Sequence, residues 1–140
     1  MKPLKSYKTF EAIYQDMRDE GCSDVQQGFA AKPILEKDAL GYDKYVSIGF
    51  SWDQNQFCCA FEELGDFNIL SQGHSIQEYW PYLLKAFILA RKPKYLRCST
   101  LNIKGWQELN DALFAVGFLP AGNVQSNHGN YKVNLWEYYK

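Results

Sequence analysis

The side chains of this sequence that could act in catalysis are few and stand apart. His74 and His128 both lie in polar loops that contain glycine, and Cys98 or Ser99 could act as a nucleophile beside either of them. The spacing of each histidine from Cys98 and Ser99 does not predict a catalytic pair. The two histidines and the acidic residues of the chain also lack the spacing of a metal-ligand set. The simplest interpretation is that both histidines are solvated, so we predict neither a catalytic histidine nor a metal site.

The four cysteines form no recognisable ligand set or disulfide framework. Cys58 and Cys59 are adjacent in a strand-like segment, so their side chains should point to opposite faces, while Cys22 and Cys98 stand alone. Because the sequence has no CxxC pair, we expect four buried free thiols.

The charge balance argues against nucleic acid as a partner. The formal net charge is −1, and the 15 Lys and Arg residues are scattered along the chain. The first ten residues, "MKPLKSYKTF", lack the apolar core of a signal peptide, and no window has the length of a membrane span. We therefore expect a globular, cytoplasmic protein that forms one domain over residues 1–140.

Aromatic residues make up 16% of the chain, which is its most unusual compositional feature. These rings can fill a large core, or they can form an adhesive surface, because Tyr and Trp are enriched at protein interfaces. The candidates for such a surface are Trp52, Trp80, Trp106 and Trp136. On this second interpretation the partner is another protein, and a homo-oligomer is one form that it can take.

The local sequence patterns predict alternating helices and strands. Helical periodicity and end signals, such as Thr9 before the first helix, predict helices over residues 8–21, 75–92 and 105–117. Runs of β-branched and aromatic residues predict strands over residues 2–7, 44–52, 56–64, 66–72, 94–100, 118–125 and 131–139. In residues 23–38 a second short helix would be interrupted by Gly28 and Pro33. The order predicts an α/β or α+β fold, with a mixed central sheet flanked by helices.

The end of the last predicted helix carries the most specific motif. In "LNDALFAVGF" an amphipathic helix closes at Gly117, and Phe118 begins the next strand. This motif, the order of the elements and a last strand rich in aromatic residues resemble the GCN5-related N-acetyltransferase (GNAT) fold. The resemblance covers nearly the whole chain and implies a single GNAT-like domain that uses acetyl-CoA.

The loop that binds CoA in this family departs from its pattern here. The family has Q/R-x-x-G-x-G/A before its central helix, where backbone N–H groups hold the pyrophosphate. In an alignment on Leu83 and Leu84, Ile76 replaces the Gln or Arg, and Tyr79 and Pro81 replace the glycines. Pro81 has no N–H to donate. If acetyl-CoA binds in a divergent way, the resemblance places it at Ser75, Ile76, Gln77 and Tyr79.

The general acid of the family is also missing. Many members have a tyrosine four residues before the Gly-Phe pair, which protonates the leaving CoA thiolate. Leu113 stands at that position here, and its side chain has no exchangeable proton. Tyr82, Tyr131 or Cys98 could replace it, although the spacing selects none of them.

The resemblance also implies a general base at the end of a central strand. Glu62 and Glu63 lie there and are the candidates. Carboxylates at a strand end are also common without any catalytic role, because they keep a sheet edge soluble. The catalytic candidates are therefore Glu62, Glu63 and Tyr82.

Two functions from different classes remain open. The first is a GNAT-like domain with an eroded acetyl-CoA motif and no cofactor, which acts by protein–protein contact or as a structural component. The second is an active N-acetyltransferase that binds acetyl-CoA in a divergent site. Two separate losses, of the anion-binding loop and of the general acid, favour the first. The compact chain is also similar to small acetyltransferase-like virion proteins of bacteriophages, which implies a location in the host cytoplasm or the virion.

Overall fold

The structure is a computed structural model, and it describes residues 2–22, 25–26, 29–30, 34–37, 43–53, 56–63, 66–72, 77–125 and 132–140. Its α-helices are α1 (Phe10–Asp19), α2 (Trp80–Arg91) and α3 (Gln107–Ala115), and short 3₁₀ helices cover Leu4–Ser6, Gln77–Tyr79 and Lys104–Trp106. Its strands are β1 (Val25–Gln26), β2 (Phe29–Ala30), β3 (Ile34–Lys37), β4 (Asp43–Asp53), β5 (Gln56–Glu63), β6 (Asp66–Gln72), β7 (Tyr95–Leu101), β8 (Leu119–Gln125) and β9 (Lys132–Tyr139).

Within these described residues, seven strands form one sheet in the order β3-β4-β5-β6-β7-β9-β8, and β1 pairs with β2 separately. Strands β6 and β7 are parallel, and the other neighbours in the large sheet are antiparallel. The sheet is thus mixed and flanked by helices, which confirms the predicted α+β class. The order of elements from β4 to β9 is also the predicted one.

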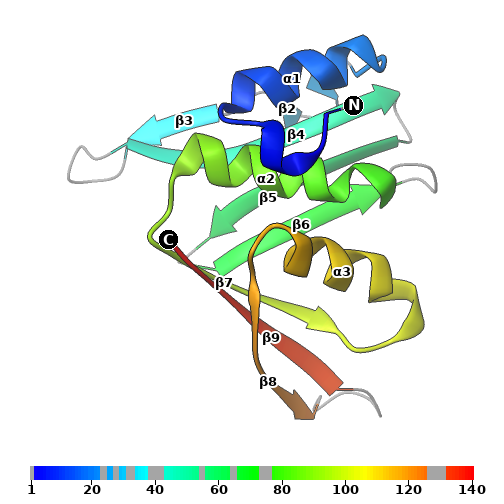
Figure 1. Cartoon of the computed structure of the whole chain (residues 1–140), viewed down its shortest axis with the longest axis vertical. Coiled ribbons are helices and arrows are strands. Elements are labelled where there is room, and N and C mark those ends of the chain that lie inside the picture. Colours follow the sequence, from blue (N-terminus) through cyan, green and yellow to red (C-terminus); the bar gives the residue numbers. More distant parts are fainter. Residues whose placement is uncertain are drawn as a thin grey trace.

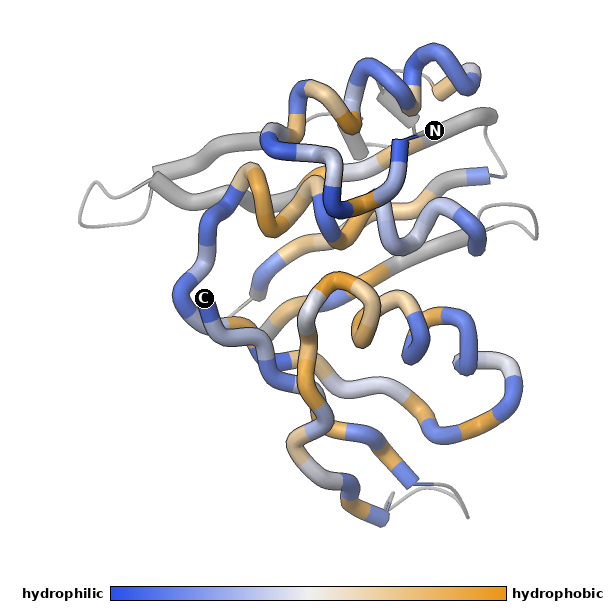
Figure 2. Tube along the Cα trace, viewed as in Figure 1, coloured by the Kyte–Doolittle hydropathy of each residue, from blue (hydrophilic) through white to orange (hydrophobic). Residues whose placement is uncertain are grey.

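The three α-helices pack on one face of this sheet (Figure 1). Helix α2 contacts both α1 and α3 as well as β4 and β5, and buried side chains of all three helices belong to one hydrophobic cluster. Helix α2 is largely hydrophobic along its length, whereas α1, which lies outside it, is largely hydrophilic (Figure 2). This difference follows from their positions, because α2 lies between other elements and α1 has one face in solvent.

Local sequence signals explain where the helices begin. The side chain of Thr9 accepts a hydrogen bond of 3.3 Å from the backbone N–H of Ala12, so Thr9 is the predicted N-cap of α1. The α-helical part of α2 begins only at Trp80, with Pro81 in its first turn. Proline fits there because the first backbone N–H groups of a helix have no partner within the helix. The predicted cap Ser75 lies outside the described residues.

The Gly-Phe pair after α3 closes the helix as predicted. Gly117 has a φ of +109°, and its N–H donates to the carbonyl oxygen of Phe114. A residue with a side chain rarely adopts this φ, so glycine is the natural choice. Phe118 is fully buried in the core cluster and stacks on Phe67 with ring centroids 5.7 Å apart.

Two predictions at the N-terminal end are wrong. Residues 4–6 form a 3₁₀ turn instead of a strand, since the N–H of Ser6 donates to the carbonyl oxygen of Pro3 at 2.9 Å. The helix considered within residues 23–38 is also absent from the described part of that segment, which forms β1, β2 and β3. Gly28 and Pro33, which lie outside the described residues, are the breakers that the sequence already contained.

Candidate functional site

The residues that the resemblance assigns to the cofactor loop directly precede α2 in the sequence. Gln77 and Tyr79 belong to the 3₁₀ turn before α2, and Ser75 and Ile76 lie outside the described residues. The N-cap residue Tyr79 makes no side-chain capping hydrogen bond, and Pro81 in the first turn removes one backbone donor. Because of Pro81, the described part of this helix start has one N–H group fewer for an anion than a helix start without proline.

The side chain of Tyr79 is held by carboxylates at the same place. Its hydroxyl donates a hydrogen bond of 3.2 Å to Oε2 of Glu20. Burial and the nearby carboxylates of Glu20 and Glu78 raise the pKa of Tyr79 to about 12, so it is a neutral donor at ordinary pH. The negative charges oppose a pyrophosphate group at this helix end.

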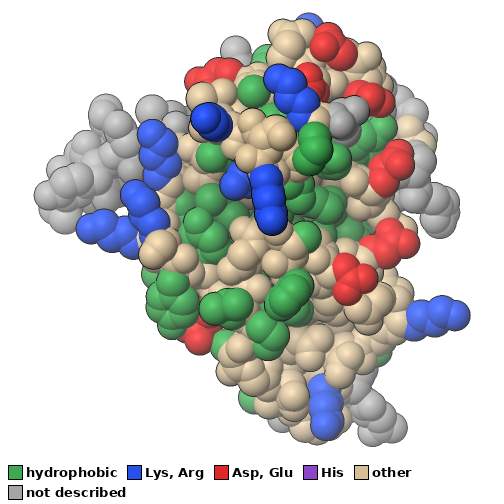
Figure 3. All heavy atoms as spheres, in the orientation of Figure 1, with side chains coloured by type: hydrophobic (Ala, Val, Ile, Leu, Met, Phe, Trp, Pro, Cys, Tyr) green, Lys and Arg blue, Asp and Glu red, His purple; other side chains and the backbone are tan. Residues whose placement is uncertain are grey.

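More acidic side chains surround Glu20. Asp16, Asp19 and Glu20 line a small cavity together with Lys2, and acidic side chains lie along α1 at the top of the molecule (Figure 3). The hydroxyl of Tyr7 donates to Oδ2 of Asp16 at 2.5 Å. Burial and the Asp16 carboxylate raise the pKa of Tyr7. The α1 side of the helix start is thus strongly acidic.

The predicted catalytic residues do not come together. Tyr82 is half-buried in the first turns of α2, and its ring meets the edge of Tyr7 with centroids 6.0 Å apart. Glu62 lies near the other end of α2, with its Oε2 3.4 Å from Nε of Arg91. At a rise of about 1.5 Å per residue, the length of α2 between Tyr82 and Arg91 is about 13 Å. The side chain of Glu63 lies outside the described side chains.

The position of the family's general acid is part of the core. The Leu113 side chain is fully buried, and the adjacent Phe114 is 62% exposed but has no proton to give. Of the other candidate donors, Cys98 is buried and Tyr131 lies outside the described residues. All four cysteines are free and buried, as the sequence predicted.

The tryptophans do not form the predicted surface. Trp80 and Trp136 are each only 7% exposed and belong to the core cluster, so they cannot present their rings to a partner. The structure thus contradicts this role for both, because β9 and the start of α2 turn these large apolar rings toward the sheet–helix interface. Trp106 is half-buried against the same cluster, and the side chain of Trp52 lies outside the described side chains.

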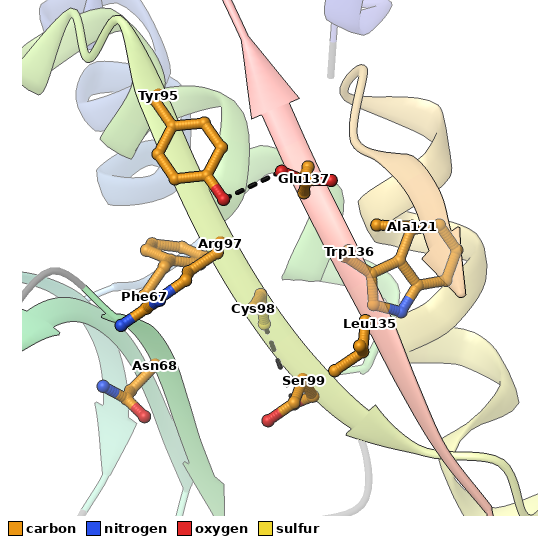
Figure 4. Close-up of a pocket in the computed structure, with 10 residues that line it drawn as sticks. All are labelled: Phe67, Asn68, Tyr95, Arg97, Cys98, Ser99, Ala121, Leu135, Trp136 and Glu137. Atoms are coloured by element: carbon orange, nitrogen blue, oxygen red, sulfur yellow. Dashed lines mark hydrogen bonds between the residues drawn. The ribbon is translucent and has the colours of Figure 1, made fainter. Parts of the chain in front are cut away.

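A cavity of about 430 Å³ opens where β6 and β7 part (Figure 4). The two parallel strands share one registered pair, Asp66 and Arg97, and Phe67 and Asn68 on β6 face the cavity from one side. The side chain of Arg97 reaches from β7 toward β6 beside Phe67 (Figure 4). Ser99 and Glu137 add a hydroxyl and a carboxylate to the lining. The cavity therefore combines an apolar wall with several polar groups, as ligand sites do.

The carboxylate of Glu137, beside this cavity, accepts two hydrogen bonds. Its Oε2 accepts hydrogen bonds from the hydroxyls of Tyr139 at 2.7 Å and Tyr95 at 2.8 Å. These two bonds lower the pKa of the Glu137 carboxyl, and the bond to Glu137 raises the pKa of Tyr139. The carboxylate is thus kept ionised, which makes it a poor proton donor.

Sequence reasoning named Cys98, Ser99 and Trp136 in other roles and missed the remaining residues that line this cavity. Alternation along "YLRCSTL" places Tyr95, Arg97 and Ser99 on one face of β7, and this signal was visible. The cross-strand partners were not visible, since the pairing of Arg97 with Glu137 depends on the register between β7 and β9.

Strands β7, β9 and β8 present an exposed surface on the side of the sheet away from the helices, and we call this surface the outer face. Alternation and register place on it Tyr95, Arg97, Ser99, Leu119, Val124, Leu135, Glu137 and Tyr139. Tyr95 is 45% exposed, Val124 51%, Leu119 56% and Tyr139 60%. Large apolar side chains gathered in this way on a sheet mark an interaction surface more often than scattered ones do.

The described part of the chain contains neither a candidate metal site nor a candidate membrane span. No group of three or more His, Cys, Asp or Glu side chains there could hold a metal ion, and no helix there is long and apolar enough to cross a membrane. His74 and His128 lie outside the described residues.

Comparison with known proteins gives matches at the level of structure. No protein-family model matches the sequence, and no curated protein matches it at a significant level. The microcin C7 self-immunity acetyltransferase MccE, solved with acetyl-CoA and AMP, is 9% identical with a TM-score of 0.45, over 67% of this chain. This chain spans only 61% of that one.

Two other solved structures cover more of the chain. A candidate acetyltransferase from Sphaerobacter thermophilus is 7% identical with a TM-score of 0.47, over 94% of this chain and 88% of that one. A variant of the spermidine N-acetyltransferase SpeG from Vibrio cholerae is 10% identical with a TM-score of 0.41, over 92% and 72%. The structures that this chain resembles are thus GNAT acetyltransferases. Their low identities and TM-scores assign neither a family nor an activity.

Proposed function

We propose that this chain is a non-catalytic acetyltransferase-like domain that works by protein–protein contact, and that its outer face makes the contact. The observation that carries the proposal is the uncovered apolar surface of β7, β9 and β8, with Tyr95, Leu119, Val124 and Tyr139 all 45% exposed or more. Burial of such side chains against a partner is the main favourable term in protein association.

The geometry at the start of α2 and at Leu113 supports a domain that does not transfer acetyl groups. Pro81 lacks an N–H, Tyr79 is bound to Glu20, and the carboxylates of Glu20 and Glu78 lie near the Tyr79 hydroxyl. An anionic cofactor at this position would lose helix donors and meet negative charge. The fully buried Leu113 at the position of the usual general acid is a second, independent loss.

The partner that this surface fits best is a second copy of the chain. Arg97 and Glu137 are direct cross-strand neighbours near the middle of the outer face. A two-fold axis at this pair would place the outer face of one copy against the same face of the other. Strand β8 has Pro120 and a bulge between Pro120 and Gly122, which oppose strand addition at its edge, so the contact is assigned to the face.

Sedimentation equilibrium of the wild-type chain and of Leu119→Asp tests this contact. The wild type should dimerise, and the variant should weaken the dimer at least about tenfold, since it removes a leucine that the dimer would bury and adds a charge. At protein concentrations where both chains are monomeric, the two melting temperatures should agree, because the Leu119 side chain is exposed in the single chain. Phe114→Asp, on the opposite side of the sheet, is the matched control. A monomeric wild type, or equal effects of the two variants, would overturn the proposal.

An active acetyltransferase is the second candidate, and the cavity between β6 and β7 is the observation that favours it. Asn68, Ser99 and Glu137 there supply groups that can hold a polar substrate. Calorimetric titration with acetyl-CoA, with thermal unfolding in parallel, separates the two candidates. A ligand at a hundred times its Kd adds about 2.7 kcal/mol of stability. We expect no heat and no stabilisation, whereas micromolar binding would overturn the non-catalytic proposal.

A further inference from the structure

A second cavity, of about 610 Å³, lies on the opposite side of β8 and β9 from the outer face. It is bounded by α3 on one side and by these two strands on the other. Its floor includes Trp136, which pairs with Pro120 in register and is buried on the helix side. Neither candidate function uses this cavity.

Five side-chain carboxamides from four segments line this cavity, which we call the amide groove. They belong to Asn102, Gln107, Asn110, Asn123 and Asn134. Asn123 and Asn134 are register partners on β8 and β9, and Gln107 and Asn110 lie on one face of α3. Each carboxamide has two N–H donors and a carbonyl acceptor, the same groups that a peptide unit presents.

The floor of the amide groove is held in place by buried hydrogen bonds. Asn110, only 7% exposed, accepts from the hydroxyl of Thr100 and donates to the carbonyl oxygen of Leu101 at 3.3 Å. The indole N–H of Trp136 donates to Oγ1 of Thr100 at 2.9 Å. A floor fixed in this way loses little freedom when a ligand binds.

The charge of the amide groove limits the ligands that it can hold. Asp111 is the one charged residue among the described residues that line it, and its Oδ1 accepts from Nε2 of Gln107 at 2.7 Å. With no cationic side chain in this described lining, phosphate and carboxylate ligands find no counter-charge there. Neutral ligands, or ligands with a positive charge near Asp111, are favoured.

The surroundings of the amide groove favour an extended ligand over a compact one. All seven residues of β8 are exposed, and Phe114, which is 62% exposed, forms an apolar rim on α3. We infer that the amide groove binds an extended polypeptide segment without acidic residues, whose backbone pairs with the carboxamides. Phe114 contacts an apolar side chain of this segment, and Asp111 accepts a Lys or Arg. This inference is independent of the proposed dimer, which uses the other face.

Side-chain amide signals in ¹H–¹⁵N NMR spectra give a direct test, because the carboxamides themselves are observed. The probes are a short flexible peptide of Gly, Ser, Leu and Lys, the same peptide with Glu for Lys, and a neutral trisaccharide. The first peptide should shift the side-chain signals of Gln107, Asn123 and Asn134 saturably at millimolar concentration. The acidic peptide and the trisaccharide should leave them in place.

A matched pair of variants then separates the groove from general peptide binding. Gln107→Ala should weaken the binding of the first peptide about fivefold, the equivalent of about one hydrogen bond. Gln15→Ala is the control, since Nε2 of Gln15 donates to Oδ1 of Asp19 at 3.0 Å in the same arrangement on α1. Equal loss in both variants, equal shifts with the acidic peptide, shifts with the trisaccharide alone, or no shift with any probe would overturn the inference.

Discussion

The indole N–H of Trp136 on β9 and the hydroxyl of Thr100 on β7 are joined by a buried hydrogen bond of 2.9 Å. The same hydroxyl bonds to Asn110 on α3, so a single oxygen links two strands and a helix. Thr100 is 2% and Asn110 7% exposed, so most of this network is buried. A satisfied network of this kind fixes how the strands and the helix sit together.

Removal of the shared hydroxyl should therefore destabilise the protein. Thr100→Val keeps the volume but leaves the indole N–H and the Asn110 carboxamide short of a partner. We expect the free energy of unfolding in urea to fall by about 2 kcal/mol. Ser99→Ala, one residue away and exposed, should change it by less than about 0.5 kcal/mol. Equal effects would show that Thr100 contributes nothing through its hydroxyl.

The glycine after α3 offers a test of backbone conformation alone. Gly117 has a φ of +109°, and a Cβ added there would meet the ring of Tyr138 at ordinary contact distances, 3.6 Å from Cε2 and 3.9 Å from Cδ2. Gly117→Ala should therefore cost about 1–2 kcal/mol through strain and not through a clash. Gly105→Ala is the control, since Gly105 lacks a positive φ and nothing lies within 4 Å of its added Cβ. A neutral Gly117→Ala would remove the helix-closing role of this glycine.

The contrast between Gly117 and Trp136 shows what the sequence could reveal. The end of α3 was predictable because a helix period, a glycine and an aromatic residue are neighbours in the chain. The burial of Trp136 was not, because it depends on pairing with Cys98, 38 positions away in the sequence numbering. A register shift of one residue would have turned the ring outward.

The residues of the candidate sites likewise include some that the sequence could reveal and others that it could not. Pro81 and Leu113 could be picked out by alignment with a local motif, and the structure has Pro81 in the first turn of α2 and Leu113 fully buried. The cavity between β6 and β7 and the amide groove could not be seen, since each is built from strands and helices that are distant in sequence. Side chains that meet only through topology leave no local pattern.

The carboxylate of Glu137 should titrate abnormally. Hydrogen bonds from Tyr139 and Tyr95 lower its pKa below the ordinary 4.5. A group with a lowered pKa in the folded state stabilises the protein above the unfolded pKa, and this contribution is lost as the pH falls through the folded pKa. Stability should thus decline below about pH 4.5 partly through Glu137.

Carboxyl-carbon NMR titration of Glu137 checks this cause. In a variant with both Tyr95→Phe and Tyr139→Phe, the pKa should rise toward 4.5, and the acid-dependent part of the stability should shrink. Tyr138→Phe is the control, because Tyr138 lies on the other face of β9 against Phe118, with ring centroids 5.5 Å apart. An unchanged pKa in the double variant would mean that the two hydroxyls do not set it.

The ion pair of Glu62 with Arg91 gives the last prediction, and it bears on the base that the family resemblance implied. The pair joins β5 to the end of α2 at 3.4 Å, with side chains 14% and 33% exposed. Such a pair contributes less than a buried one because water screens it, so a coupling energy of about 0.5–1 kcal/mol is expected. Urea unfolding of Glu62→Gln, Arg91→Gln and the double variant measures it. If Glu62→Gln is as destabilising without Arg91 as with it, the Glu62 carboxylate does not stabilise the fold through this ion pair.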